Sequence, residues 1–277
     1  MPSPDRTRPT GPRVLPGAVS PLTADLVHGR PRRCAVLAGS RVGAYLGAPG
    51  RVLPVLGHGA VALPGALRVA GPLDLSDLRP GDPVTVGDGE VVLPGVVVRG
   101  ARTWRPARVG AAPAPRGHRS AGVHRALVAA TAASPSWLAD GVRAALTTPD
   151  PGPAVRSLVG RGPGLTPSGD DALAGALLLR RALAADEATL ATPLARAVRA
   201  RLHATTSVSA ALLEAALDGW AAPEAVALVA AVAADDADAL TTALPAALAV
   251  GHTSGRDLVT GVVAALAVLH PSGRIAA

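Results

Sequence analysis

Several side chains are rare or missing in the 277-residue sequence. It has no Phe, one Tyr and one Cys, and its basic residues other than His are all Arg. A single cysteine excludes an internal disulfide and any metal site built from several cysteines. Cys34 lies in the apolar run Cys34–Leu37, which is typical of a buried structural cysteine. Ala, Val and Leu supply nearly all of the 49% hydrophobic residues, so the core must be built from small and branched side chains.

The positive charge is uneven along the chain. Residues 1–117 hold 15 Arg and 7 acidic residues, a net charge of +8, whereas residues 118–277 hold 12 Arg and 13 acidic residues, a net charge of −1. A basic half suits nucleic acid, an acidic partner or an anionic substrate. The arginines are scattered, however, and almost no aromatic residues accompany them to stack on bases. We therefore do not expect nucleic acid as a partner.

No apolar run is long enough to cross a bilayer. The longest, Leu258–Leu269, falls short of the 18 or so residues that a spanning helix needs. Residues 1–20 are rich in Pro and Arg and lack the apolar stretch of a signal peptide, which predicts a disordered lead-in. We expect a soluble, cytoplasmic protein with no membrane partner.

Residues 21–110 show short apolar runs broken by Gly and Pro, a pattern that indicates strands. Asp88-Gly89 between two Val-rich runs predicts a tight type I′ hairpin, and Arg79–Asp82 predicts another turn. Many short strands at close spacing predict a small β-barrel or sandwich domain. The expected strands are Cys34–Leu37, Arg51–Leu56, Ala60–Leu63, Val84–Val86, Val91–Leu93 and Val96–Val98.

The spacing of apolar residues along the chain changes after residues 111–117, which we interpret as a linker. From 118 to 277, Ala and Leu recur at helical spacing in long blocks. The predicted fold class is therefore α+β, an N-terminal small β-barrel or sandwich followed by an all-α domain. Its helices are expected at about 119–132, 136–147, 168–186, 190–203, 206–219, 223–234, 236–249 and 254–269.

A glycine-rich loop, Gly160–Pro167, enters the helix expected from residue 168. Its glycines, including Gly162 and Gly164, let the backbone take positive φ or approach a ligand closely. Thr166 and Ser168 are suited to cap the helix, with Ser168-x-x-Asp171 as a variant capping box. Free N–H groups at a helix start, such as that of Gly169, bind phosphate or carboxylate.

Charged residues flank this loop. Arg161 adds a guanidinium that can bind an anion through two hydrogen bonds. Asp170 and Asp171 repel an anion, so they suit a site that also holds Mg²⁺, with both as ligands, or one that binds a cationic or amide group. The alternative is purely structural, because carboxylates in the first turn of a helix are favoured by its dipole alone.

A second copy of the motif supports a functional site. Ser168–Gly175 and Ser254–Gly261 share the pattern S-G-x-D-x-x-x-G, and each opens an apolar helix. A mid-helix glycine costs about 1 kcal/mol relative to alanine, so two at the same offset predict two helices that cross through them. The helix starts then lie side by side, and the following residues converge on one site: Ser168, Asp171, His252, Ser254, Gly255 and Asp257.

Within this group, His252 is the side chain best suited to proton transfer near neutral pH, with Asp171 and Asp257 as the other catalytic candidates. Gly255 repeats the position of Gly169 as a backbone donor. A third polar cluster, His203–Ser209, either caps another helix or lines the same site.

These residues resemble a known bacterial family. The string Gly162–Asp171 with Gly175 is similar to the hallmark of the family catalogued as domain of unknown function 2877, which includes the AllH-type subunit of oxamate carbamoyltransferase. Gly251–Gly255 with Gly261 is similar to its C-terminal signature, and Thr205–Gly219 to its middle block. Ala172 departs from the bulky aromatic residue expected after the Asp pair.

The resemblance implies a subunit of a multi-subunit carbamoyltransferase of purine (allantoin) breakdown. Its partners would be the other carbamoyltransferase subunits and a small anionic substrate: phosphate, carbamoyl phosphate or oxamate. That enzyme interconverts oxalurate plus phosphate with oxamate plus carbamoyl phosphate. The alternative is a non-catalytic regulatory or scaffolding subunit that binds an anionic metabolite.

Overall fold

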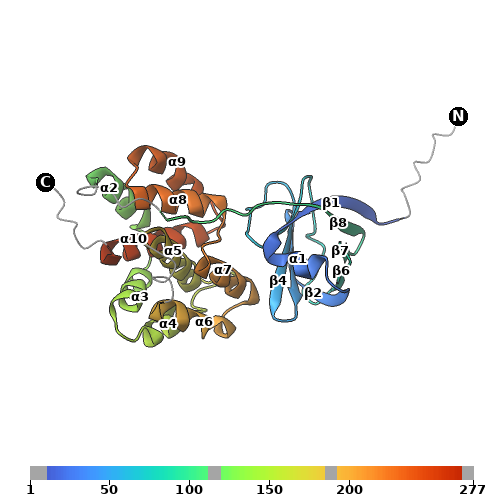
Figure 1. Ribbon diagram of the computed structural model, residues 1–277, viewed down its shortest axis with the longest axis horizontal. Coiled ribbons are helices and arrows are strands. Elements are labelled where there is room, and N and C mark those ends of the chain that lie inside the picture. The colour runs from blue at the N-terminus through green and yellow to red at the C-terminus, as the bar shows by residue number, and fades with distance from the viewer. Residues whose placement is uncertain (1–10, 112–119, 185–191, 270–277) are drawn as a thin grey trace. The chain divides into compact units, whose positions relative to one another are not determined.

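A computed structural model describes residues 11–111, 120–184 and 192–269. The contacts divide the chain into two compact units. The first comprises Met1–Ala60 and Gly65–Arg105, and the second comprises Val61–Pro64 and Pro106–Ala277. The named strands belong to the first unit and the long helices to the second (Figure 1). The predicted α+β class, with a β part and a helical part, is confirmed.

The first unit is a closed β-barrel, so of the two architectures left open by the sequence the barrel is correct. Its strands follow the spatial order β1-β5-β4-β3-β2-β6-β7-β8, and the parallel pair β1 and β8 closes the ring. Val and Leu side chains from all eight strands fill its interior, as composition required. The strands are β1 (Arg13–Val19), β2 (Arg32–Ser40), β3 (Gly43–Ala48), β4 (Arg51–Leu56), β5 (Leu67–Val69), β6 (Pro83–Gly87), β7 (Glu90–Leu93) and β8 (Val96–Thr103).

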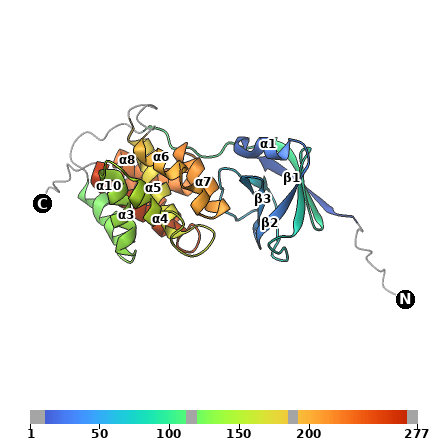
Figure 2. The ribbon, with the colours of Figure 1, turned by 90° about the horizontal axis from the view of Figure 1, so that it is seen from below.

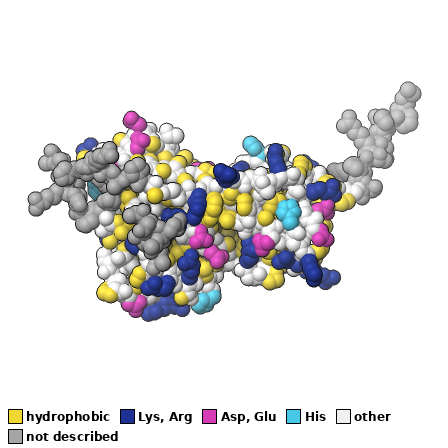
Figure 3. Space-filling model, in the orientation of Figure 1, with side chains coloured by type: hydrophobic (Ala, Val, Ile, Leu, Met, Phe, Trp, Pro, Cys, Tyr) yellow, Lys and Arg dark blue, Asp and Glu magenta, His cyan; other side chains and the backbone are white. Residues whose placement is uncertain are grey.

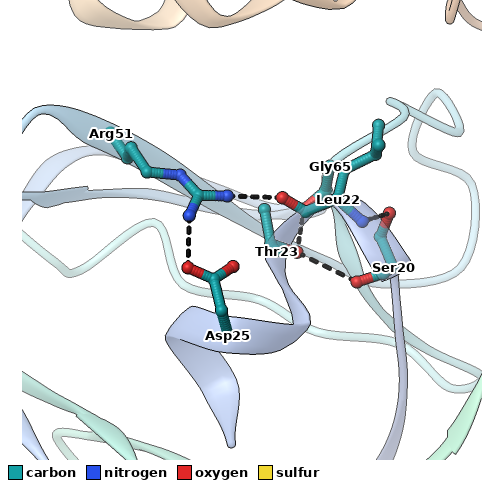
Figure 4. Close-up of polar contacts among 6 residues, drawn as sticks. All are labelled: Ser20, Leu22, Thr23, Asp25, Arg51 and Gly65. Atoms are coloured by element: carbon teal, nitrogen blue, oxygen red, sulfur yellow. Dashed lines mark hydrogen bonds and ion pairs between the residues drawn. The ribbon is translucent and has the colours of Figure 1, made fainter. Parts of the chain in front are cut away.

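Local signals explain two connections of the barrel. Asp88 and Gly89 have φ of 51° and 83°, the two positive angles that a type I′ hairpin between β6 and β7 needs. The short helix α1 (Ala24–Val27) follows β1, and the Arg51 guanidinium ties this region to β4 by bonding to the Asp25 carboxylate and the Leu22 carbonyl (Figure 4).

Three expectations for the first half are corrected. The lead-in was expected to be disordered through residue 20, but Arg13–Val19 form β1 because they complete the ring between β5 and β8; residues 1–10 lie outside the described part. Ala60–Leu63 form no strand. The β-rich region was expected to end at 110, yet the compact unit ends at Arg105 because residues 107–109 bond to the backbone of residues 219–221.

The second unit is helical, and most of its helices begin and end within a few residues of the predicted positions. The short helix α4 was not predicted. The expected linker falls almost wholly outside the described residues, at 112–117. The helices are α2 (Ala121–Thr131), α3 (Ser136–Thr147), α4 (Gly152–Leu158), α5 (Ser168–Ala182), α6 (Pro193–Arg199), α7 (Ser207–Leu217), α8 (Pro223–Ala234), α9 (Ala237–Leu248) and α10 (Ser254–Leu269).

Helix α5 lies at the centre of this unit, buried along nearly its whole length. It packs against α10, α7, α8 and α3, and Figures 1 and 2 both show α5 and α10 side by side. The core around them consists almost entirely of Ala, Val and Leu. None of the helices in the described ranges is long and apolar enough to cross a membrane. On the face drawn in Figure 3, the Arg side chains are spread out and form no single patch.

Candidate functional site

The two motif helices cross through their glycines, as the repeated pattern predicted. A Cβ placed on Gly175 would lie 2.2 Å from the Leu258 carbonyl oxygen, and one on Gly261 would lie 1.8 Å from the Ala172 carbonyl oxygen. Ala172 and Leu258 occupy the same position of the two motif copies, so the contact is reciprocal. Backbone therefore meets backbone at the crossing, and the first turns of α5 and α10 are held at a fixed separation.

The loop before α5 folds back over the helix start. Gly162 and Gly164 have φ of 125° and 88°, which confirms the need for glycine at both positions. The Gly169 N–H donates to the Arg161 carbonyl oxygen at 2.9 Å, so this N–H is already occupied by the protein. Ser168 is the first helical residue and Pro167 precedes it as N-cap without a side-chain bond, so the expected capping by Ser168 is wrong.

The start of α10 repeats this arrangement. Gly251 has φ of 63° and its Cβ position faces Ser254, much as that of Gly162 faces Ser168. The Gly255 N–H donates to the Val250 carbonyl oxygen at 3.0 Å. In both helices the N–H of the motif glycine is therefore bonded within the protein, and neither fits the predicted role of a free backbone donor to an anion.

Asp171 lies where the two helix starts meet. The hydroxyls of Thr166 and Ser254 lie 2.8 Å apart, which joins the α5 loop to α10. Burial raises the pKa of Asp171 to about 8; hydrogen bonding by Ser254 and Thr166 opposes this rise, and the nearby charges of Asp257 and Asp170 add to it. At neutral pH the Asp171 carboxyl is therefore mostly protonated.

Asp257 is the second buried carboxyl of the site. It is 4% exposed and Asp171 is 9% exposed, and the two are close enough to interact electrostatically. In each residue the Oδ2 atom is buried and has no hydrogen-bond partner in the described structure. Buried polar atoms are normally paired with protein, water or ligand, so two unpaired oxygens from equivalent positions of a repeat make this place the candidate site.

Asp170 serves a different purpose. It is 1% exposed; its Oδ1 accepts the Gly160 N–H at 3.0 Å, and its Oδ2 accepts the hydroxyls of Thr205 and Ser209. Asp170 thus fastens the glycine-rich loop to the start of α7. Since its oxygens are engaged by the protein, Asp170 does not fit the predicted role of a magnesium ligand beside Asp171. No three His, Cys, Asp or Glu side chains of the described residues are grouped to hold a metal ion.

Two predicted site residues lie at the edge of this arrangement. The Arg161 guanidinium lies over the Trp137 ring, 3.8 Å from its centroid, and so anchors the loop to α3. His252 lies in the exposed turn before α10, two residues from Ser254. The structure thus brings Thr166, Asp171, Ser254 and Asp257 together, while Arg161 and His252 are exposed.

Sequence reasoning missed two features of the site. Trp137 gave no signal, because an isolated aromatic in an expected helix is an ordinary core residue. Within the polar cluster 203–209, the capping interpretation holds, because Thr206 caps α7 by accepting the Ser209 N–H; Thr205 and Ser209 instead bind Asp170, a pairing that the sequence did not predict. A polar cluster facing a buried carboxylate in another helix is the signal that could have indicated this pairing.

Comparison with family models gives a match. The model of the family described as oxamate carbamoyltransferase subunit AllH matches residues 158–266. This segment runs from the end of α4 into α10 and contains both motif copies, which confirms the resemblance inferred from the motifs. Searches of curated proteins and of solved structures found no match.

Proposed function

Starting from the match of residues 158–266 to the AllH family, we propose that this chain is a subunit of a carbamoyltransferase that acts on oxamate or oxalurate and carbamoyl phosphate. We propose further that the paired starts of α5 and α10 form its substrate site. The single observation that carries the location is the pair of buried, unpartnered oxygens on Asp171 and Asp257, inside the matched segment.

The proposed reaction defines what such a site must supply. In one direction, the carbamoyl carbon of oxalurate leaves its imide-like nitrogen and bonds to a phosphate oxygen, giving carbamoyl phosphate and oxamate. The proton lost by phosphate ends on the oxamate nitrogen. The site therefore needs donors for a carboxylate or phosphate group and a residue that carries one proton between oxygen and nitrogen.

The described side chains meet these needs as follows. The hydroxyls of Thr166, Ser168 and Ser254, at the two helix starts, bind the anionic group. His252, exposed two residues from Ser254, carries the proton from the phosphate oxygen to the oxamate nitrogen. Asp171 and Asp257 contact the substrate within the buried part of the site.

The test is reconstitution. The chain is purified together with the other carbamoyltransferase subunits that the family match implies, and carbamoyl phosphate formed from oxalurate and phosphate is measured. We expect activity that requires this chain, and a loss of at least about 100-fold in kcat for His252→Ala, within the range of a lost acid–base group. His58→Ala, an exposed histidine of the β-barrel unit, is the matched control.

The same assay separates the regulatory alternative. If the complex without this chain retains full catalysis and loses only its response to metabolite concentration, the chain is a regulatory or scaffolding subunit. If the chain does not assemble with the other subunits and its addition brings no formation of carbamoyl phosphate, the proposal as a whole is refuted.

A further inference from the structure

The two unpartnered oxygens belong to buried carboxyl groups that lie close to one another. Asp171 and Asp257 both come from first helical turns, where a carboxylate is normally stabilised by the helix dipole. Here they face each other's charge in a buried setting, where two negative charges cannot both be accommodated cheaply.

Two neighbouring carboxyl groups can offer two different kinds of hydrogen-bonding atom. A protonated carboxyl has an O–H to donate, and a carboxyl oxygen without a proton accepts. The raised pKa of Asp171 makes it the proton carrier, and the charges that act on it are those of Asp257 on α10 and Asp170 on its own helix. The unpartnered Oδ2 of Asp171 is then a donor that lacks an acceptor, and the unpartnered Oδ2 of Asp257 is an acceptor that lacks a donor.

We propose that Asp171 and Asp257 together recognise the edge of a primary amide, with Asp171 donating to its carbonyl oxygen and Asp257 accepting from its N–H. The pair is thereby the specificity determinant of the site, which takes a –C(O)NH₂ group in preference to a carboxylate of the same shape. This inference rests on the proposed function for the location of the substrate, but it concerns a binding mode that holds whether or not the chain catalyses transfer.

Other ligand classes fit the described atoms less well. Phosphate and carboxylate groups lack the donor that the Asp257 oxygen needs, and as anions they are poorly suited to a place between two acidic side chains. The N–H groups of Gly169 and Gly255, which would otherwise attract an anion, already bond to Arg161 and Val250. An ammonium ion satisfies Asp257 but brings no acceptor for the Asp171 O–H. A group with an acceptor and a donor side by side pairs both oxygens at once.

The hydroxyls of Thr166 and Ser254 lie 2.8 Å apart and both act on Asp171, so they join the loop before α5 to α10 beside this carboxyl. Thr206 also holds this loop, through the Leu165 carbonyl. Both Oδ2 atoms are buried, so a ligand reaches them only when a neighbouring part of the protein moves.

The test uses the purified full chain with oxamate and with oxalate, in which an oxygen replaces the amide nitrogen. Binding is measured by calorimetry and by thermal shift, at about pH 6.5 and about pH 9.5. We expect oxamate to bind at least about tenfold more tightly than oxalate at the lower pH, the effect of about one hydrogen bond in a buried site. We expect oxamate affinity to fall at the higher pH, because Asp171 loses its proton.

Two variants sharpen the result. Asp171→Asn keeps a donor at this position but cannot ionise, so it should bind oxamate at both pH values. Asp257→Leu removes the acceptor at similar volume and should lose at least about tenfold in oxamate affinity. Circular dichroism checks that each variant is folded; if Asp257→Leu does not fold, the Asp171→Asn pH profile decides alone.

The outcomes are separable from those of the proposed function. Equal binding of oxalate and oxamate, stabilisation by ammonium but not oxamate, or no binding of oxamate at about pH 6.5 would overturn the inference. An oxamate affinity of Asp171→Asn that still falls at high pH would also overturn it. Selective oxamate binding in a complex without transferase activity would instead support the recognition and refute the catalytic proposal.

Discussion

The crossing of α5 and α10 gives the sharpest stability prediction. In Gly261→Ala the added methyl would start 1.8 Å from the Ala172 carbonyl oxygen, where even a tight contact needs 3.0 Å. The helices would have to separate by more than about 1 Å, and no rotamer change can relieve a clash with backbone. Overpacking of this kind costs about 1–3 kcal/mol, and we take the upper end because both partners are rigid. The better helix propensity of alanine returns up to about 1 kcal/mol. The net expectation is a loss of about 2 kcal/mol.

The assay is urea denaturation followed by far-UV circular dichroism at a wavelength dominated by helix. Gly122→Ala is the matched control: this exposed glycine lies in α2, and its Cβ position is no closer than 3.4 Å to the Ser120 hydroxyl. The control should be neutral or stabilised by up to about 1 kcal/mol. Gly175→Ala, with a clash of 2.2 Å, should resemble Gly261→Ala. If Gly261→Ala unfolds at the same urea concentration as the control, the backbone contact does not hold the helices together and the reasoning fails.

Three further predictions concern the site. Because the folded-state pKa of Asp171 is raised to about 8, its contribution to stability is fully present below about pH 4 and is lost as the pH rises through 8. In Asp171→Asn, the free energy of unfolding should therefore depend less on pH between those values. A pH dependence equal to that of the unchanged protein would contradict this. Asp170→Ala leaves buried donors without an acceptor and should destabilise the protein by roughly 3 kcal/mol in urea denaturation, against about 1 kcal/mol for Ser209→Ala. Equal losses would show that the hydrogen bond from Gly160 to Asp170 does not stabilise the fold. Arg161→Ala removes the stacking on Trp137 and should cost about 0.5–1 kcal/mol with a change in tryptophan fluorescence; unaltered emission would argue against the stacked pair.

Much of this fold can be predicted from local signals. Helices such as α3 and α8 begin next to or at Pro135 and Pro223, which marks their starts in the sequence. Their helical spacing of apolar residues continues to the end of each helix, which marks where it stops. The hairpin at Asp88-Gly89 is equally local. Strands β1, β3 and β5, in contrast, were missed. The residues of β1 become a strand through partners far along the chain, whereas β3 lies beside its sequence neighbours but its run is rich in Gly and Ala.

The candidate site, too, could be predicted from the sequence only in part. The repeat with its two glycines was enough to predict which helices cross, because a mid-helix glycine needs a tertiary cause. It could not reveal that Asp170 and Asp171, neighbours in the chain, have opposite environments. Their side chains leave the helix about 100° apart, so Asp170 meets Thr205 and Ser209 of a separate segment while Asp171 meets α10. Nor could the sequence show that the glycine N–H groups are already bonded by carbonyls of their own loops.

The parallel pairing of β1 with β8 has a consequence for how this protein folds during synthesis. Arg13 pairs with Val96, so the first strand must remain without this neighbour until the eighth has left the ribosome. Contacts this distant in sequence form slowly, whereas helices close their bonds within a few residues. We therefore expect the barrel to close late in its own synthesis and all at once. Until then the apolar residues of β1 and β2 are exposed, which makes the nascent N-terminal half the segment most in need of a chaperone.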